Sequence, residues 1–219
     1  INYGSLDPQT TTSQPFTFAL SGSCGDTFTL ELSVTDSEDF SRTFPVNVEL
    51  GQLSLDLSED FDTPAQTSLP PQWSSVQTRG GSGWSLSATR SESDSLAAFA
   101  QTPPSLGTST LVSPPVTIGP QGGTLEFRHF VATEASSRNP DTGFDGAVLE
   151  VSLDEGEWED IESAGGRFSE GGYNRTMSAA YQNPLPRRRA WSGSLGWINT
   201  VVNLPSEFGA YTLRFRWIL

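Results

Sequence analysis

Hydrophobic and polar residues alternate with a period of two in the first part of the chain. Three stretches within residues 15–50 show this pattern; their apolar members are Phe16, Phe18 and Leu20, then Phe28, Leu30, Leu32 and Val34, then Phe44, Val46, Val48 and Leu50. A period of two places successive side chains on opposite faces of an extended strand. The pattern therefore predicts three antiparallel strands, each with one buried and one solvated face. The segments "SGSCGD" and "TDSEDFS" are predicted to be the turns between them.

A second series of strand patterns, spaced more widely, begins at residue 57. Strands are predicted at residues 83–89, 96–100, 109–118, 123–132, 146–154, 157–162, 196–204 and 211–219. Hardly any segment of helical length shows a helical period. Eight or so strands without helices favour a jelly roll or a closely related two-sheet sandwich. The predicted fold class is therefore all-β.

Composition narrows the possible partners. The net charge is −14, and all 12 basic residues are arginine. This acidity disfavours nucleic acid and anionic membranes as partners, and acidity with Arg but no Lys favours an extracellular or cell-surface location. No apolar run is long enough to predict a membrane-spanning helix. Cys24 is the only cysteine, so it is either a small buried hydrophobe or bonded to a partner outside this chain.

The first fifty residues resemble part of a known domain type. The order "SGSCGD", "TFTLELSVTD" and "FPVNVEL" resembles the closing strands of immunoglobulin-like (Ig-like) repeats in bacterial secreted and surface proteins. A two-sheet sandwich needs about seven strands, and only three are predicted here. The resemblance implies that residues 1–50 are the C-terminal part of an Ig-like domain, joined by a linker at residues 51–56 to a second domain.

Residues 57–219 carry another set of landmarks: "EDFD…LPPQW", "GSGWSLS", "LVSPPVTI", "TLEFRHFVATE", "FDGAVLEVSLDEGEWEDI" and "LRFRW". In this order they resemble the MAM-like jelly-roll module that accompanies bacterial secreted metalloproteases of the immune inhibitor A type and many large surface proteins. The most specific part is residues 129–134 followed by residues 144–146 and Trp158. In that family the module is non-catalytic, and a peptidase, when present, is a separate domain. Residues 163–195 have no counterpart in shorter members.

Acidic residues are concentrated between positions 133 and 162, and three interpretations compete for them. A retaining glycosidase needs two carboxyl groups about 5–5.5 Å apart. Glu157 and Glu159 share one strand face, but Glu162 falls on the other, so this pattern disfavours a glycosidase. A solvated hairpin turn explains the acids around "LDEGEWED", which are Asp154, Glu155, Glu157 and Glu159.

A calcium site is the third interpretation. Ca²⁺ binds carboxylate and carbonyl oxygens, commonly from loops. Glu134 and Asp145 flank the Gly/Pro/Asn-containing loop "ASSRNPDTGF", and Asp141 lies within it. Asp60 and Asp62 in "SEDFD" would join them if the first strand lies beside the last strands. We therefore predict a structural calcium ion held by these five acids.

The single histidine, His129, excludes a His-rich zinc site. No Gly-x-Ser-x-Gly motif stands between a strand and a helix, so a Ser-His-Asp triad is disfavoured. Because His129 lies in a predicted strand, we expect it to hydrogen-bond a neighbouring carboxylate such as Glu134 rather than act in catalysis.

The segment "NPLPRRRAWSGSLGW" combines Arg187, Arg188 and Arg189 with Trp191 and Trp197. One interpretation is a ligand-binding patch in which exposed tryptophans stack on sugar rings and arginines bind carboxylates. The other, which we favour because large rings are usually buried, packs the tryptophans under a long loop and pairs the arginines with acidic neighbours.

The sequence thus predicts a non-catalytic, extracellular accessory or adhesion module of a larger secreted or surface protein. Its expected partners are a protein or glycan of a cell surface or matrix, and other domains of the same polypeptide. One alternative is a carbohydrate-binding module that targets a linked hydrolase. A second is a structural unit of an extracellular fibre.

Overall fold

A computed structural model describes residues 1–5, 7, 9–22, 26–36, 38, 40–51, 54–62, 68–78, 80–92, 95–101 and 105–219. The described residues are nearly all in strands and connecting segments, with one 3₁₀ helix, η1 (Ser206–Ala210). The chain divides into two compact units, residues 1–54 and residues 55–219. The all-β prediction is confirmed. Cys24 lies outside the described residues.

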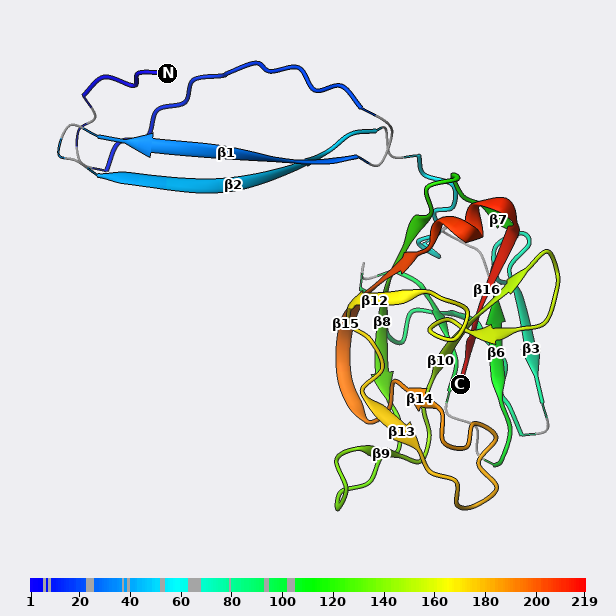
Figure 1. The fold of residues 1–219 in the computed structure, drawn as a ribbon. Coiled ribbons are helices and arrows are strands. Elements are labelled where there is room, and N and C mark those ends of the chain that lie inside the picture. Colours follow the sequence, from blue (N-terminus) through cyan, green and yellow to red (C-terminus); the bar gives the residue numbers. More distant parts are fainter. Residues whose placement is uncertain are drawn as a thin grey trace. The chain divides into compact units, whose positions relative to one another are not determined.

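The first unit contains a long antiparallel hairpin, β1 (Thr27–Thr35) and β2 (Ser41–Glu49) (Figure 1). Its register places Phe28, Leu30 and Leu32 of β1 opposite apolar residues of β2 on a single face. The other face is polar, and its side chains bond across the strands; for example, the Thr29 hydroxyl donates to Asn47 Oδ1 at 2.9 Å. The strand predicted around residues 16–20 is wrong, because this segment pairs with no strand although its residues alternate.

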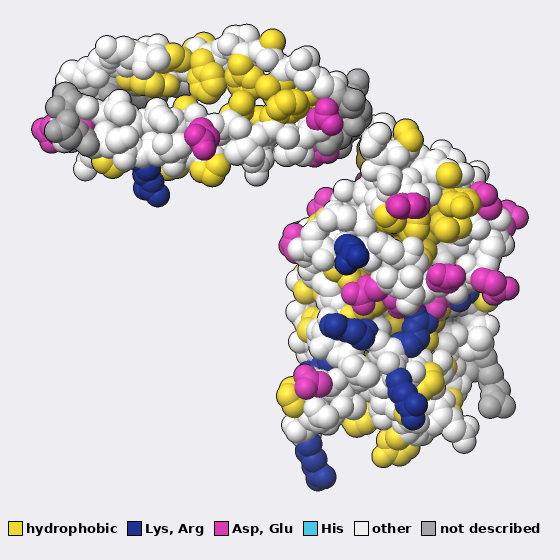
Figure 2. Space-filling model, viewed as in Figure 1, with side chains coloured by type: hydrophobic (Ala, Val, Ile, Leu, Met, Phe, Trp, Pro, Cys, Tyr) yellow, Lys and Arg dark blue, Asp and Glu magenta, His cyan; other side chains and the backbone are white. Residues whose placement is uncertain are grey.

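The apolar face of this hairpin is largely exposed. Leu32 and Val46 are 42% and 45% accessible to solvent, and Figure 2 shows hydrophobic side chains gathered along the inner side of the unit. A two-stranded hairpin is marginally stable in water without a partner for its apolar face. No second sheet covers this face within the described residues of the first unit.

The second unit is built on two antiparallel sheets (Figure 1). The first has the order β11-β10-β16-β6-β3, with β7 also paired to β16; the second has the order β12-β15-β8. The bounds of the first are β11 (Glu159–Asp160), β10 (Val148–Leu153), β16 (Thr212–Ile218), β6 (Ser109–Val112), β3 (Ser74–Gln77) and β7 (Val116–Thr117). Those of the second are β12 (Arg167–Glu170), β15 (Ser194–Leu204) and β8 (Gly123–Ala132).

Two small sheets complete the unit. One joins β9 (Thr142–Gly143), β13 (Arg175–Met177) and β14 (Arg189–Ala190), and the other joins β4 (Ser85–Ser87) and β5 (Ala97–Phe99). The predicted strand at residues 109–118 is divided into β6 and β7 around Pro114 and Pro115, because proline has no N–H to donate to a ladder.

The core lies between the two large sheets and is rich in aromatic rings. Phe127 of β8 meets Trp217 of β16 edge-on at a centroid distance of 5.4 Å and Trp191 at 5.8 Å. Trp191 is fully buried and also contacts Tyr173 at 4.6 Å. Edge-to-face ring pairs of this kind stabilise a core beyond their buried area. The inward faces of β10, β15 and β16 supply the aliphatic part, with Leu149, Val151, Val202 and Leu213 buried, and β16 also buries Phe215.

His129 belongs to this core. Its ring lies 4.7 Å from that of Trp191, and Nε2 is 3.0 Å from Thr200 Oγ1. The Thr200 hydroxyl donates its proton to the Gly171 carbonyl, so Nε2 of His129 is the donor in their bond. The prediction of Glu134 as its partner is wrong. Burial lowers the pKa of His129 to about 4, which keeps the ring neutral and non-basic near neutral pH.

The burial of neutral His129 predicts that the free energy of unfolding decreases at acidic pH because of this residue. The histidine pKa is 6.5 in the unfolded chain and about 4 in the folded chain, so stability is complete above pH 6.5 and falls as the pH decreases toward 4. The expected loss is about 3 kcal/mol across that window. His129→Gln replaces the ring with an amide that can still form hydrogen bonds but does not titrate in this pH range. Urea unfolding from pH 7 to pH 4.5 should therefore give a shallower decline for the variant; parallel curves would contradict the prediction.

Candidate functional site

A row of charged side chains crosses the outer face of the first large sheet. Glu150 in β10 lies opposite Asp160 of β11 on one side and Arg216 of β16 on the other. Because successive residues of a strand alternate faces, Glu150 points away from the core that holds Leu149 and Val151. Its side chain is nevertheless only 6% exposed. A carboxylate this deeply buried needs charged partners.

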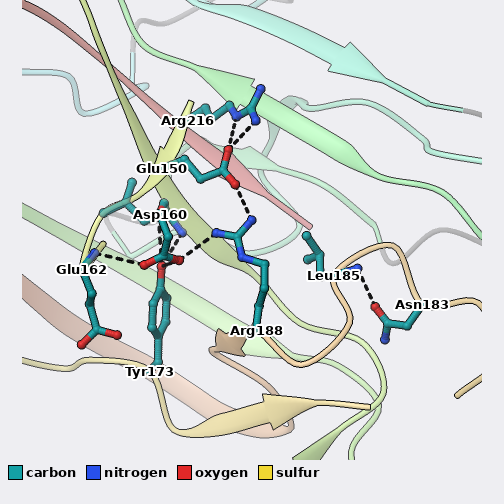
Figure 3. Close-up of polar contacts among 9 residues, drawn as sticks. Glu150, Asp160, Glu162, Tyr173, Asn183, Leu185, Arg188 and Arg216 are labelled. Atoms are coloured by element: carbon teal, nitrogen blue, oxygen red, sulfur yellow. Dashed lines mark hydrogen bonds and ion pairs between the residues drawn. The ribbon is translucent and has the colours of Figure 1, made fainter. Parts of the chain in front are cut away.

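Arg188, from the segment between β13 and β14, supplies one of those partners (Figure 3). Its guanidinium pairs with Glu150 and with Asp160, the latter at 2.7 Å. Arg216 Nε donates to the other carboxylate oxygen of Glu150 at 2.5 Å. Burial alone lowers the pKa of Arg188, but its bonds to Asp160 and Glu150 outweigh that effect and raise it. The cation therefore stays charged and holds its segment against the sheet.

Tyr173 fastens the same segment to the strand backbone. Its hydroxyl accepts the Leu149 N–H at 2.9 Å and lies 3.1 Å from the Leu149 carbonyl and 3.2 Å from Asp160 (Figure 3). Burial, together with the charge of Asp160, raises the pKa of Tyr173 far above its usual value. Nearby, Gly171 has φ +58°, and an added Cβ would lie 1.9 Å from the Asn199 carbonyl oxygen. Only glycine fits at position 171.

Arg188 stands at the base of a loop, residues 178–187, which we call the rim loop. The Met177 N–H donates to the Arg188 carbonyl at 2.8 Å, and the Arg187 N–H donates to the Met177 carbonyl at 3.0 Å. At the tip, Tyr181 and Gln182 have φ values of +58° and +56°. These left-handed conformations in non-glycine residues cost on the order of 1 kcal/mol or more each. They leave the Tyr181 side chain 80% exposed.

Asn183 ties the rim loop to the neighbouring segment 144–146. Its amide nitrogen donates to the Phe144 carbonyl at 2.7 Å, and its amide oxygen accepts the Leu185 N–H at 2.8 Å. Between these segments and residues 105–107 lies a cleft of about 470 Å³. This volume falls in the range of about 300–1,000 Å³ typical of small-ligand pockets. The cleft contains the predicted pair Glu134 and Asp145.

The lining of the cleft is part apolar and part acidic. Met177 and Leu185 are buried contributors, while the rings of Phe144 and Tyr181 stand edge to face at 6.4 Å. Burial, and next the negative charge of Glu134, raises the pKa of Asp145. The two residues are also joined through their backbones, because the Asp145 N–H donates to the Glu134 carbonyl at 3.0 Å. In the described part of the chain, neither forms a salt bridge with a basic side chain.

The other predicted calcium ligands are not gathered in this cleft. Asp141 is exposed on its loop, where its carbonyl accepts the Thr176 N–H at 2.8 Å. Asp60 accepts the Asp62 N–H, and Asp62 accepts the Leu96 N–H at 2.6 Å. Among the described residues, no three His, Cys, Asp or Glu side chains are grouped as metal ligands would be. The structure thus brings together Glu134 and Asp145 and leaves the other three elsewhere.

The predicted ligand-binding residues also separate. Trp191 is fully buried, so the interpretation that it stacks on a sugar is wrong. Trp197 is half-buried against Phe130 at 5.8 Å, and Arg189 donates to the Tyr173 carbonyl at 2.7 Å. Arg187 is exposed. Trp191 is packed in the core and Arg188 is paired with acidic side chains, as the second interpretation of this segment predicts.

The sequence predicts acidic partners for Arg188 but does not identify Glu150 as one of those acids, and it does not identify Tyr181. For Glu150 a signal existed: a single charge inside the apolar run "AVLEVSL" requires an opposite charge nearby if that strand is buried on both faces. No comparable sequence pattern indicates that Tyr181 is exposed.

Comparison with known proteins finds no matching family model, curated protein or solved structure. Within the described ranges, no helix has the length and apolar character needed to cross a bilayer. Function is therefore inferred from the chemistry of the cleft and the elements that hold it.

Removing Arg188 should weaken the fold far more than removing its neighbour. Arg188→Met leaves Asp160 without its arginine and Glu150 with Arg216 alone, for an expected loss of about 2–3 kcal/mol. Arg187→Met removes the same charge from an exposed position that makes no ion pair among the described residues, and should change stability by about 0.5 kcal/mol or less. Guanidinium unfolding compares the two; equal losses would contradict a structural role for the buried pair.

Calcium binding stays a prediction, now centred on Glu134 and Asp145. Ca²⁺ takes about six to eight oxygen ligands, yet the carbonyls of both residues already accept protein hydrogen bonds. Binding by their carboxylates would raise the melting temperature in excess Ca²⁺ relative to chelator. The double variant Glu134→Gln/Asp145→Asn should lose that rise. An unchanged melting temperature of the unaltered protein would eliminate a calcium site.

Proposed function

We propose that this protein is a non-catalytic accessory or adhesion module of a larger secreted or cell-surface protein, and that it binds its partner through the cleft beside the rim loop. The observation that carries the proposal is the exposed Tyr181 ring, held on a strained turn at the edge of a pocket. Left-handed conformations in non-glycine residues persist where surrounding bonds enforce them, and they cluster at ligand sites.

The construction of the cleft supports recognition. Asn183 fixes the rim loop from within and Arg188 fixes its C-terminal end, so the cleft is formed before a ligand arrives. A preorganised site loses less conformational entropy on binding than a flexible one. Aromatic side chains at such a rim supply large contact area with few rotatable bonds. The buried, neutral His129 is unsuited to act as a general base.

The resemblance to MAM-like and Ig-like modules supports the same proposal at a finer level. In this proposal, residues 57–219 form a MAM-like jelly roll, and residues 1–50 are the C-terminal strands of an Ig-like sandwich. The exposed apolar face of β1 and β2 supports the second part, because an Ig-like domain buries such a face against its other sheet.

A carbohydrate-binding module is the alternative function. It is favoured by one observation, the Phe144–Tyr181 ring pair at the cleft, since exposed aromatic rings can stack on sugars. Trp191 takes no part in it. This alternative and the main proposal share the cleft but differ in the partner.

The experiment is a binding screen of the intact chain against immobilised extracellular proteins and a glycan array. Tyr181→Ala should reduce binding by about tenfold or more, as expected for an aromatic anchor residue. Tyr211→Ala, which removes an exposed tyrosine outside the cleft, is the matched control and should leave binding unchanged. Equal binding by the unaltered chain and Tyr181→Ala, or the absence of any binding, would refute the proposal. Tyr181-dependent binding confined to glycans would select the carbohydrate alternative.

A further inference from the structure

The acids of this unit fall into two groups that differ in their partners. Glu150 and Asp160 on the outer sheet face are both paired with Arg188, and Glu150 also with Arg216. Glu134 and Asp145 in the cleft form no salt bridge with a basic side chain of the described residues. Arginines thus neutralise Glu150 and Asp160, whereas the cleft pair has no basic partner among the residues that the structure describes.

The surroundings of the pair suit an organic cation. Among the described residues that line the cleft, Glu134 and Asp145 are the only acidic ones, and none is basic. Phe144 and Tyr181 stand beside them, and Tyr181 is 80% exposed. A guanidinium or ammonium group gains attraction from an aromatic face as well as from carboxylates. The apolar surface of the cleft, to which Leu185 contributes, matches the methylene stem of a long basic side chain.

We propose that the cleft binds a positively charged side chain, arginine or lysine, presented by a partner protein. This inference rests on the proposed function, because it names the ligand class of the same cleft. The cation occupies the space between the Glu134 and Asp145 carboxylates and the Tyr181 ring. It places a positive charge beside two acids that line the same cleft.

Charge disfavours the other ligand classes. A neutral sugar leaves both carboxylates without a counter-charge, and an anionic ligand adds a third negative charge to the site. The net charge of −14 attracts basic surfaces over distances of about one Debye length and repels acidic ones. The net charge therefore attracts a basic patch on a partner protein at long range, and the cleft binds one of its basic side chains once the two proteins are in contact.

The test titrates the intact, ¹⁵N-labelled chain with N-acetylarginine amide, and separately with N-acetylcitrulline amide, which has nearly the same shape and no charge. Chelator is present throughout, so that divalent cations cannot compete. The arginine compound should shift the backbone amide resonances of Asp145, Tyr181 and Asn183. The citrulline compound should bind at least about tenfold more weakly, because charge-assisted hydrogen bonds and cation–π attraction are lost.

Two double variants, each lacking two negative charges, show whether arginine binds at the cleft or is only attracted by the overall negative charge. Glu134→Gln/Asp145→Asn should weaken arginine binding by about tenfold or more. Glu157→Gln/Glu159→Gln removes the same charge from the exposed hairpin and should leave it unchanged. Equal binding of citrulline, equal weakening by both variants, or the absence of shifts with the arginine compound would overturn the inference. Tyr181-dependent adhesion without preference for arginine would overturn this inference alone and leave the proposed function standing.

Discussion

The buried carboxylate of Glu150 is the constraint on which the second unit depends. It lies in the central part of a sheet, where an unpaired charge would cost several kcal/mol. Its position opposite Asp160 and Arg216 fixes the register of three strands, and its need for further charge draws Arg188 onto the sheet. The long segment between β12 and β15 is thereby fastened to the outer face of β10, so a requirement of one side chain organises more than twenty residues.

The cleft results from that attachment. Arg188 closes the base of the rim loop, Tyr173 holds the start of the same segment against the Leu149 backbone, and Asn183 joins the loop to Phe144. Binding residues placed on loops over a rigid sandwich are common, because the sheets supply stability and the loops supply variety. Here the sheets bury an aromatic core, and the acids and rings that line the cleft come from segments 134–146 and 178–187.

The sequence predicts the elements whose residues alternate over many positions. Strands β8 and β16 can be predicted because apolar and polar residues alternate along much of each of them, and β15 can be predicted because it is rich in β-branched and aromatic residues. The strands β9, β13 and β14 are two or three residues long, too short for any period to show, so the segment carrying the rim loop has no predicted strand. The alternation at Phe16, Phe18 and Leu20 indicates a shared face, but a strand also requires a partner to bond.

The candidate site is predicted only in part, for related reasons. Glu134 and Asp145 stand out because they flank one loop, and contacts local in sequence can be inferred from spacing. Asp60 and Asp62 required a contact across the fold, and they are not among the residues that line the cleft. Trp191 is indistinguishable from an exposed tryptophan until the sheet positions show it inside the core. Tyr181 depends on a left-handed turn at residues without glycine, which no local propensity indicates.

Amide hydrogen exchange in the unaltered chain and in Glu150→Gln tests most directly whether the buried carboxylate holds the rim loop in place. We expect the amides of Met177 and Asn183 to exchange about tenfold or more faster in the variant, while those in β8 and β15 keep their protection, because local opening exposes only the segment that lost its anchor. Unchanged protection in the rim loop, or a uniform loss over both sheets, would contradict this role for Glu150.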